Sequence, residues 1–286
     1  MSPAPVSRRA FLAGSAGAVL GAAAVGASVG NAGALLPAKN TAISPLVLAT
    51  DLHASADPQR FVFAIARGAK YASFGPAQVA FAPPGSSEGT KLDTNLYKDG
   101  LPKGRGVYVT DAVFPVAGVY KAVAILGKKQ VPFAVQVNAD AVAPTVGQAA
   151  PTAPSPTPTA TLGVDPICTR SPKCPLHDVS LSDVIGKQPV AVMFATPALC
   201  QSQYCGPVLD ELLDVMAPYQ QKGVAMVHVE IYASTRGATL APTVEAWGIE
   251  TEPWLFTIDA SGVIRERLDG AFATNEVTGA LDRLVA

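Results

Sequence analysis

A proline-rich stretch near the middle of the chain separates two segments with different residue patterns. Residues 151–158 read Pro-Thr-Ala-Pro-Ser-Pro-Thr-Pro, and the longer run 139–166 is rich in Pro, Ala, Thr and Gly. Proline has no backbone N–H to donate, and this composition has too few large apolar side chains to bury a core. We therefore predict that 139–166 is an extended, semi-rigid linker and that the residues on either side of it fold separately.

The charge balance excludes one class of partner. The chain has 286 residues, with 21 Lys and Arg against 22 Asp and Glu, which gives a formal net charge of -1. Because no positive surplus is available to neutralise phosphates, we expect no nucleic-acid partner. Hydrophobic residues make up 49% of the chain, which is enough for more than one core.

The N-terminus resembles a twin-arginine export signal. Arg8 and Arg9 precede Phe-Leu and an Ala- and Gly-rich run with no charge before Lys39. We assign the signal to residues 1–36. The resemblance implies the twin-arginine export machinery as a partner and a secreted, periplasmic or envelope-associated protein. The alternative is a membrane anchor, because residues 10–29 are uncharged and long enough to cross a bilayer.

Residues 44–138 have the pattern of an all-β sandwich. Short apolar runs alternate with turn-forming clusters, at 61–65, 79–81, 107–109, 119–123 and 133–137. The stretch 114–120, Phe-Pro-Val-Ala-Gly-Val-Tyr, resembles a corner of immunoglobulin-like domains where a Tyr hydroxyl bonds back to the chain. We expect an immunoglobulin-like domain at 44–138 with no catalytic constellation, and we expect its single histidine, His53, to lie at the surface.

Residues 167–286 alternate between strand and helix patterns. The order is βαβαββα, with strands expected at 189–195, 224–231, 254–259 and 263–267 and helices at 205–221, around 243–247 and at 276–285. The last two strands flank Ala-Ser-Gly and predict a hairpin. An antiparallel final pair makes a mixed sheet covered by helices.

The four cysteines form two close pairs, Cys168 with Cys174 and Cys200 with Cys205. Four cysteines allow three pairings, of which local pairing is the simplest. Export would bring them into an oxidising compartment, where disulfides persist. Cys205 stands where a strand has ended and a helix begins, and unpaired N–H groups at a helix start favour a thiolate. We read Cys168–Cys174 as a structural disulfide, with a second dithiol that passes electrons to Cys205 as the alternative.

The C-terminal part resembles the thioredoxin family in two places. Tyr204-Cys205-Gly206-Pro207 is similar to the family's Trp-Cys-Gly-Pro-Cys, and residues 247–256 are similar to the segment around its cis-proline. The resemblance implies a thioredoxin-like domain at 167–286, a nucleophilic role for Cys205, and a cis peptide at Pro253 facing that sulfur. Tyr204 and Trp254 would line a groove for an extended substrate, unless they are core residues.

The chain departs from that family at two points. The family's second cysteine falls on Val208, so Cys200 is the replacement, in a Cys-x4-Cys motif with Cys205. The strand at 190–195 is wholly apolar, so it lacks the buried acid that thioredoxins use as proton acceptor. Proton transfer would then be slower or would pass through water.

The resulting prediction is a thiol-disulfide oxidoreductase that acts on protein thiols or disulfides outside the cytoplasm and needs no cofactor. Catalytic activity stays open, because an inert Cys200–Cys205 disulfide would instead belong to a cell-surface binding or scaffold protein. A third possibility is a Sco-type copper-binding protein, in which His228 or His177 adds an imidazole to the cysteine pair. No metal site is assigned from the sequence.

Overall fold

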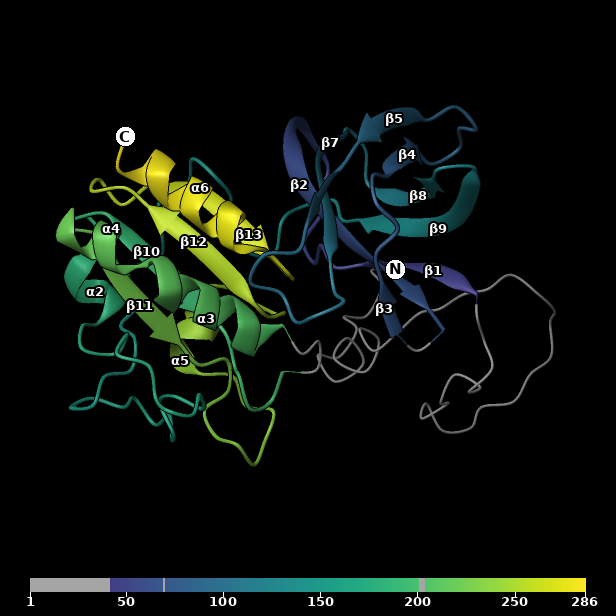
Figure 1. The fold of residues 1–286 in the computed structure, drawn as a ribbon. Helices are drawn as coiled ribbons and strands as arrows, with labels where there is room; N and C mark the ends of the chain where they lie inside the picture. The colour runs from purple at the N-terminus through teal and green to yellow at the C-terminus, as the bar shows by residue number, and fades with distance from the viewer. Residues whose placement is uncertain (1–41, 69, 201–203) are drawn as a thin grey trace.

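The structure, a computed structural model, describes residues 42–68, 70–200 and 204–286. The predicted export signal at 1–36 and the alternative anchor at 10–29 lie outside the described residues. Figure 1 shows an N-terminal half of strands, residues 42–138, beside a C-terminal half of strands and helices, residues 139–286. Within the described residues, no helix is long and apolar enough to cross a membrane.

The N-terminal half consists of two antiparallel sheets. One has the order β1-β2-β7-β6 with β3 also paired to β2, and the other has the order β5-β4-β8-β9. The predicted apolar runs lie in β2, β4, β7, β8 and β9. The strands are β1 Ile43–Val47, β2 Ser55–Arg67, β3 Lys70–Ala72, β4 Gln78–Ala82, β5 Thr90–Asp93, β6 Asn95–Tyr97, β7 Val107–Phe114, β8 Gly118–Leu126 and β9 Lys129–Val137.

Side chains from both sheets form one aromatic core. Phe61 packs edge-on against Phe81 at 4.8 Å, and Phe114 packs edge-on against Tyr120 at 5.2 Å between ring centroids. The Tyr120 hydroxyl donates a hydrogen bond to the Val116 carbonyl at 3.0 Å. This is the bond back to the chain that the sequence predicted, and it fixes the turn between β7 and β8.

The C-terminal half is built on a four-stranded mixed sheet of order β11-β10-β12-β13. β10 is parallel to β11 and antiparallel to β12, and β12 and β13 form the predicted antiparallel pair. α3 and α6 pack on one face, while α2 and α5 pack on the other. The elements are α2 Leu181–Val184, β10 Val190–Phe194, α3 Cys205–Val215, α4 Ala217–Gln221, β11 Ala225–Val229, α5 Pro242–Ala246, β12 Trp254–Ile258, β13 Ile264–Asp269 and α6 Thr274–Leu284.

The helix expected at 205–221 is divided in two. α3 ends at Val215 and α4 begins at Ala217, with Pro218 in the first turn of α4. Proline cannot donate to the carbonyl four residues earlier, so a continuous helix would lose a hydrogen bond there. The first turn of a new helix accepts proline without that loss.

Residues 139–166 differ from the expected linker, because they lie against the C-terminal half. The Ala150 N–H donates to the Gly262 carbonyl at 2.9 Å, and the Thr243 hydroxyl donates to the Pro154 carbonyl at 2.7 Å. Ala143 and Val164 are buried in the same core as β10. The composition excludes helix and sheet, but proline-rich backbone still has carbonyls that accept hydrogen bonds. The segment has turns at several points and is packed rather than free.

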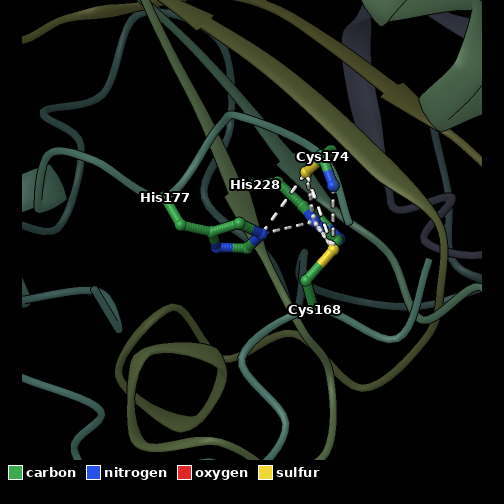
Figure 2. Close-up of side chains that lie close together, drawn as sticks. All are labelled: Cys168, Cys174, His177 and His228. Carbon is green, nitrogen blue, oxygen red and sulfur yellow. Dashed lines mark hydrogen bonds between the residues drawn. The ribbon is translucent and has the colours of Figure 1, made fainter. Parts of the chain in front are cut away.

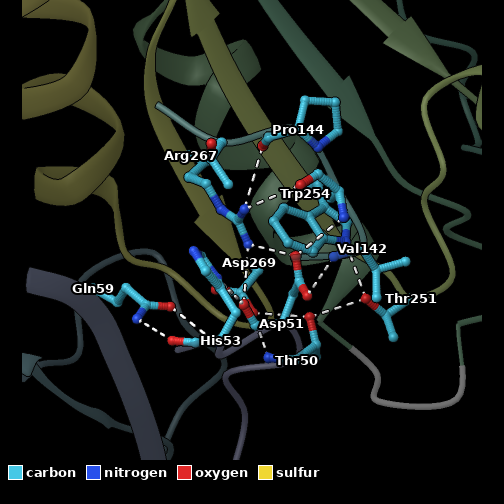
Figure 3. Close-up of polar contacts among 12 residues, drawn as sticks. Thr50, Asp51, His53, Gln59, Val142, Pro144, Thr251, Trp254, Arg267 and Asp269 are labelled. Atoms are coloured by element: carbon cyan, nitrogen blue, oxygen red, sulfur yellow. Dashed lines mark hydrogen bonds and ion pairs between the residues drawn. The ribbon is translucent and has the colours of Figure 1, made fainter. Parts of the chain in front are cut away.

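The two halves meet through buried charges. Arg60 of β2 pairs with Glu276 of α6 at 2.8 Å, and Arg267 of β13 pairs with Asp51 at 2.8 Å (Figure 3). The Thr50 hydroxyl donates to the Asp269 carboxylate at 2.8 Å. All four ion-pair side chains are largely buried. Buried charges are tolerated only when they are paired and hydrogen-bonded, so these contacts fix how the halves dock.

Candidate functional site: two cysteine groups

The four cysteines lie in two separate groups. The first, which we name the Cys/Glu group, contains Cys200, Cys205 and Glu252. The second, the Cys/His cluster, contains Cys168, Cys174, His177 and His228. In each group, the ligand atoms lie within 4.8 Å of one another. The pairing of cysteines into two neighbourhoods therefore follows the sequence, but their other partners come from distant segments.

Within the Cys/Glu group, Cys200 and Cys205 differ in exposure. Cys205 is the first residue of α3 and is fully buried, whereas Cys200 is partly exposed. The Cys205 N–H donates to the Cys200 sulfur at 3.2 Å. Burial is the main cause that raises the pKa of the Cys205 thiol well above its usual range, and a hydrogen bond with Cys200 adds to it. The helix start was expected to activate Cys205, but desolvation outweighs it, and the accessible sulfur is that of Cys200.

Glu252 is the residue that sequence reasoning missed. It directly precedes Pro253, and the Glu252–Pro253 bond is cis, as the family resemblance implied. Burial raises the pKa of Glu252 to about 7, and the charge of Cys200 contributes further. The Tyr232 hydroxyl donates to its carboxylate at 3.4 Å. The thioredoxin resemblance implied a proton-accepting acid in the strand at 190–195, which has none. In this chain the buried acid is instead the residue next to the expected cis-proline.

Tyr204 and Trp254 are core residues, which was the alternative to a substrate groove. Tyr204 is fully buried and packs edge-on against Tyr71 of the N-terminal half, at 5.8 Å between centroids. Trp254 is 1% exposed, its indole N–H donates to the Thr251 hydroxyl at 3.0 Å, and Arg267 lies 4.8 Å from its ring (Figure 3). Tyr204 therefore packs against the N-terminal half, whereas Trp254 packs inside the core of the C-terminal half.

The Cys/His cluster joins one loop to a strand (Figure 2). Cys168, Cys174 and His177 come from the loop before α2, and His228 comes from β11. The two sulfurs are 3.7 Å apart, and the Cys174 sulfur is 3.3 Å from His177 Nε2 and 3.4 Å from His228 Nδ1. All four residues are buried.

The Cys168–Cys174 disulfide predicted from the sequence is not formed in this structure. A disulfide requires sulfurs about 2.05 Å apart, whereas these are 3.7 Å apart and both cysteines are free. The hydrogen bond between the sulfurs is the main cause that lowers the pKa of Cys168 and raises that of Cys174. The sequence signal for a richer site was His177, three residues after Cys174, since cysteine and histidine at close spacing are typical of metal ligands.

Backbone between β10 and α3 connects the two groups. The Ala195 carbonyl accepts a hydrogen bond from His228 Nε2 at 3.1 Å, and the next residue, Thr196, forms a backbone hydrogen bond with the Cys205 thiol. The Ala198 N–H donates to the Thr169 hydroxyl at 3.1 Å. Both histidines of the C-terminal half belong to the Cys/His cluster, and within the described residues the Cys/Glu group has a carboxylate and no imidazole.

Comparisons with known proteins found little similarity. No protein-family model matches the chain. No curated protein matches it either. Among solved structures, a thioredoxin-like superfamily protein, SPOA0173, covers 38% of this chain and 86% of its own at 16% identity and a TM-score of 0.25. Titin M4 in its trigonal form covers 34% of this chain and 95% of its own at 14% identity and a TM-score of 0.18. The chain thus has a weak thioredoxin-like structural neighbour.

Proposed function

We propose that this protein is an extracytoplasmic thiol-disulfide oxidoreductase whose Cys-x4-Cys motif is Cys200 and Cys205. The observation that supports it is the arrangement of a partly exposed sulfur, a buried sulfur behind it and a carboxylate within 4.8 Å of both. Exchange catalysts need an accessible sulfur that attacks and a second sulfur that resolves the mixed disulfide. We assign attack to Cys200 and resolution to Cys205, which reverses the roles expected from the sequence.

The reaction runs in two balanced steps. The Cys200 thiolate attacks a protein disulfide, forms a mixed disulfide, and releases one substrate thiolate. Cys205 then attacks the Cys200 sulfur, so that the Cys200–Cys205 disulfide forms and the second substrate thiolate leaves. The substrate is reduced by two electrons and the cysteine pair is oxidised by two. A second protein dithiol reverses the change and returns the pair to its thiols.

Glu252 serves as the proton acceptor for Cys205. A buried thiol with a raised pKa attacks only after losing its proton, and a base works best when its pKa is near the working pH. The Glu252 carboxyl group, with its pKa raised to about 7, meets that condition. It takes the Cys205 proton during resolution and returns a proton to the leaving substrate thiolate.

The other finer assignments belong to the same proposal. We assign a thioredoxin-like domain to 167–286, an immunoglobulin-like domain to 44–138 and a twin-arginine signal to 1–36, which makes the export machinery a partner. The mixed sheet with helices on both faces and the Tyr120 corner support the first two. Arg8 and Arg9 support the third. Replacing both with Lys should keep the protein in the cytoplasm, and unchanged export would exclude this signal.

The test uses a peptide with one disulfide bond that separates a fluorophore from a quencher. Cys200→Ser should abolish its reduction, because no accessible nucleophile is left. Cys205→Ser should start the reaction and stop at a mixed disulfide on Cys200, detected by mass spectrometry. Trapping on Cys205 in Cys200→Ser would restore the original assignment of roles. Full reduction by both variants would exclude the cysteine pair.

A redox titration separates this proposal from a scaffold with an inert disulfide. An exchange catalyst should interconvert its Cys200 and Cys205 thiols between roughly -120 and -270 mV. A pair that stays oxidised until below about -300 mV is a structural disulfide. That result would favour a non-catalytic binding protein.

A further inference from the structure

We infer that Cys168, Cys174, His177 and His228 form a structural zinc site. Cysteine sulfur and histidine nitrogen are the ligands that Zn²⁺ takes in closed structural sites, usually as four ligands in a tetrahedron. Figure 2 shows the four side chains converging from one loop and one strand, with their ligand atoms turned toward one another. This inference is independent of the chemistry at Cys200 and Cys205.

The distances between the ligand atoms fit a tetrahedron around one ion. Bond lengths of about 2.3 Å to sulfur and 2.05 Å to nitrogen place ligand atoms about 3.8 Å apart for two sulfurs, about 3.5 Å for sulfur and nitrogen, and about 3.3 Å for two nitrogens. The structure has 3.7 Å between the sulfurs, and 3.3, 3.4 and 3.9 Å for three sulfur–nitrogen pairs. The two histidine nitrogens are 3.2 Å apart.

Hydrogen bonding orients His228 as a ligand. Its Nε2 lies 3.1 Å from the Ala195 carbonyl, which can only accept, so Nε2 carries the proton. The lone pair is then on Nδ1, the atom that faces both sulfurs and His177 Nε2. A backbone carbonyl on the far nitrogen is the usual partner that fixes the tautomer of a metal-binding histidine.

Burial and charge favour a closed structural site over an open catalytic one. All four residues are buried, with exposures of 2%, 6%, 4% and 0% in chain order. Two thiolates balance the charge of Zn²⁺, so a loaded site adds no net charge to the interior. A Cys168–Cys174 disulfide would use neither histidine, and the His228 lone pair would then face sulfurs with no proton to donate.

The ion would fix the loop that precedes α2 to the sheet. Cys168 and Cys174 would be linked to β11 through His228, 54 residues beyond Cys174. The same loop already contacts its surroundings through Thr169, whose hydroxyl accepts the Ala198 N–H. Zinc therefore stabilises a contact that lies two residues before Cys200.

The first experiment purifies the full chain without chelators and measures its metal content by elemental mass spectrometry. One zinc ion per chain is expected. Replacing zinc with Co²⁺ should give sulfur-to-cobalt charge-transfer bands in the near ultraviolet and the visible bands of a tetrahedral ion. X-ray absorption should find two sulfurs at about 2.3 Å and two nitrogens at about 2.0 Å.

Two ligand variants and one matched control assign the site. Cys174→Ser and His177→Asn should each lower zinc retention during dialysis against a chelator by at least tenfold. Cys200→Ser, a cysteine change outside the cluster, should retain one zinc ion per chain. The inference would be overturned if the wild-type chain held no zinc and had a Cys168–Cys174 disulfide, detected as a mass lower by two hydrogens. Copper in place of zinc would also overturn it, as would cobalt spectra with no sulfur ligand.

Discussion

The two cysteine groups start from similar sequence patterns and arrive at opposite environments. Each has a pair of cysteines five or six residues apart, at 200 and 205 before and at the start of α3, and at 168 and 174 in the loop before α2. In the Cys/His cluster all four residues are buried, and two imidazoles lie beside the two sulfurs. In the Cys/Glu group one sulfur is partly exposed and the third member is a carboxylate. Cysteine spacing therefore does not distinguish the two environments, whereas exposure and the third partner do.

The largest expected effect concerns the stability that each group supplies. Withdrawing zinc should lower the free energy of unfolding by at least about 5 kcal/mol. Structural zinc contributes about 10–16 kcal/mol in zinc-finger peptides, and we expect a smaller loss here because the C-terminal half also has a packed sheet that does not depend on the ion. Urea unfolding with and without a strong chelator measures it. The Cys200→Ser variant should lose the same amount of stability when the chelator is added, because its zinc ligands are unchanged. An unfolding midpoint that does not respond to the chelator would remove the distinction between the groups.

A smaller effect on stability is expected from a buried carboxyl group on α3, the helix that begins at Cys205. Glu211 of α3 is 2% exposed, and burial raises the pKa of its carboxyl group to about 8, with Asp99 and Glu276 adding to the shift. The folded chain keeps this proton after the unfolded chain has lost it. Stability from this group is therefore highest below about pH 4.5, falls as the pH rises toward 8, and is constant above that.

Glu211→Gln removes this pH dependence. The variant should be more stable than wild type at pH 8 by a few kcal/mol, at about 1.4 kcal/mol for each unit of pKa, and should show little difference near pH 4.5. Urea unfolding of both proteins across this range measures the difference, and the zinc contribution cancels between them. Glu245→Gln, the same change at an exposed carboxyl group of α5, is the matched control. Parallel curves for Glu211→Gln and wild type would contradict the assignment.

The comparison also shows how far the sequence reaches. Short apolar runs predicted β10, β11 and β12, because each of these strands is buried along its whole length. The turn residues between β12 and β13 predicted that this last pair is antiparallel. Neither pattern predicted the Cys/His cluster, since His228 stands between two valines in a strand and meets Cys168 only through folding across 60 residues. Local spacing of Cys174 and His177 was the available signal. Composition misled at 139–166, because hydrogen bonding by proline-rich carbonyls leaves no pattern in a sequence.

The smallest expected effect concerns the carboxylate of Glu252 and is measured as the pH dependence of the exchange rate. The rate of exchange by wild type should rise with pH through about 7, as this group loses its proton and becomes a base for Cys205. Glu252→Gln should lose that rise and should be slower at pH 8 by about a hundredfold, which is the lower end of what a general base contributes. Glu250→Gln, an exposed neighbour, should keep the wild-type profile.

Zinc content separates a local effect of Glu252→Gln from a general one. The variant should still hold one zinc ion per chain, because Glu252 belongs to the Cys/Glu group and not to the Cys/His cluster. Slower resolution should also let the mixed disulfide on Cys200 accumulate, which alkylation and mass spectrometry detect. If the variant keeps the pH profile of wild type, proton transfer from Cys205 does not pass through Glu252. The acid beside the cis-proline would then have only a packing role, and the Cys/Glu group would differ from the Cys/His cluster in exposure and in its lack of imidazoles.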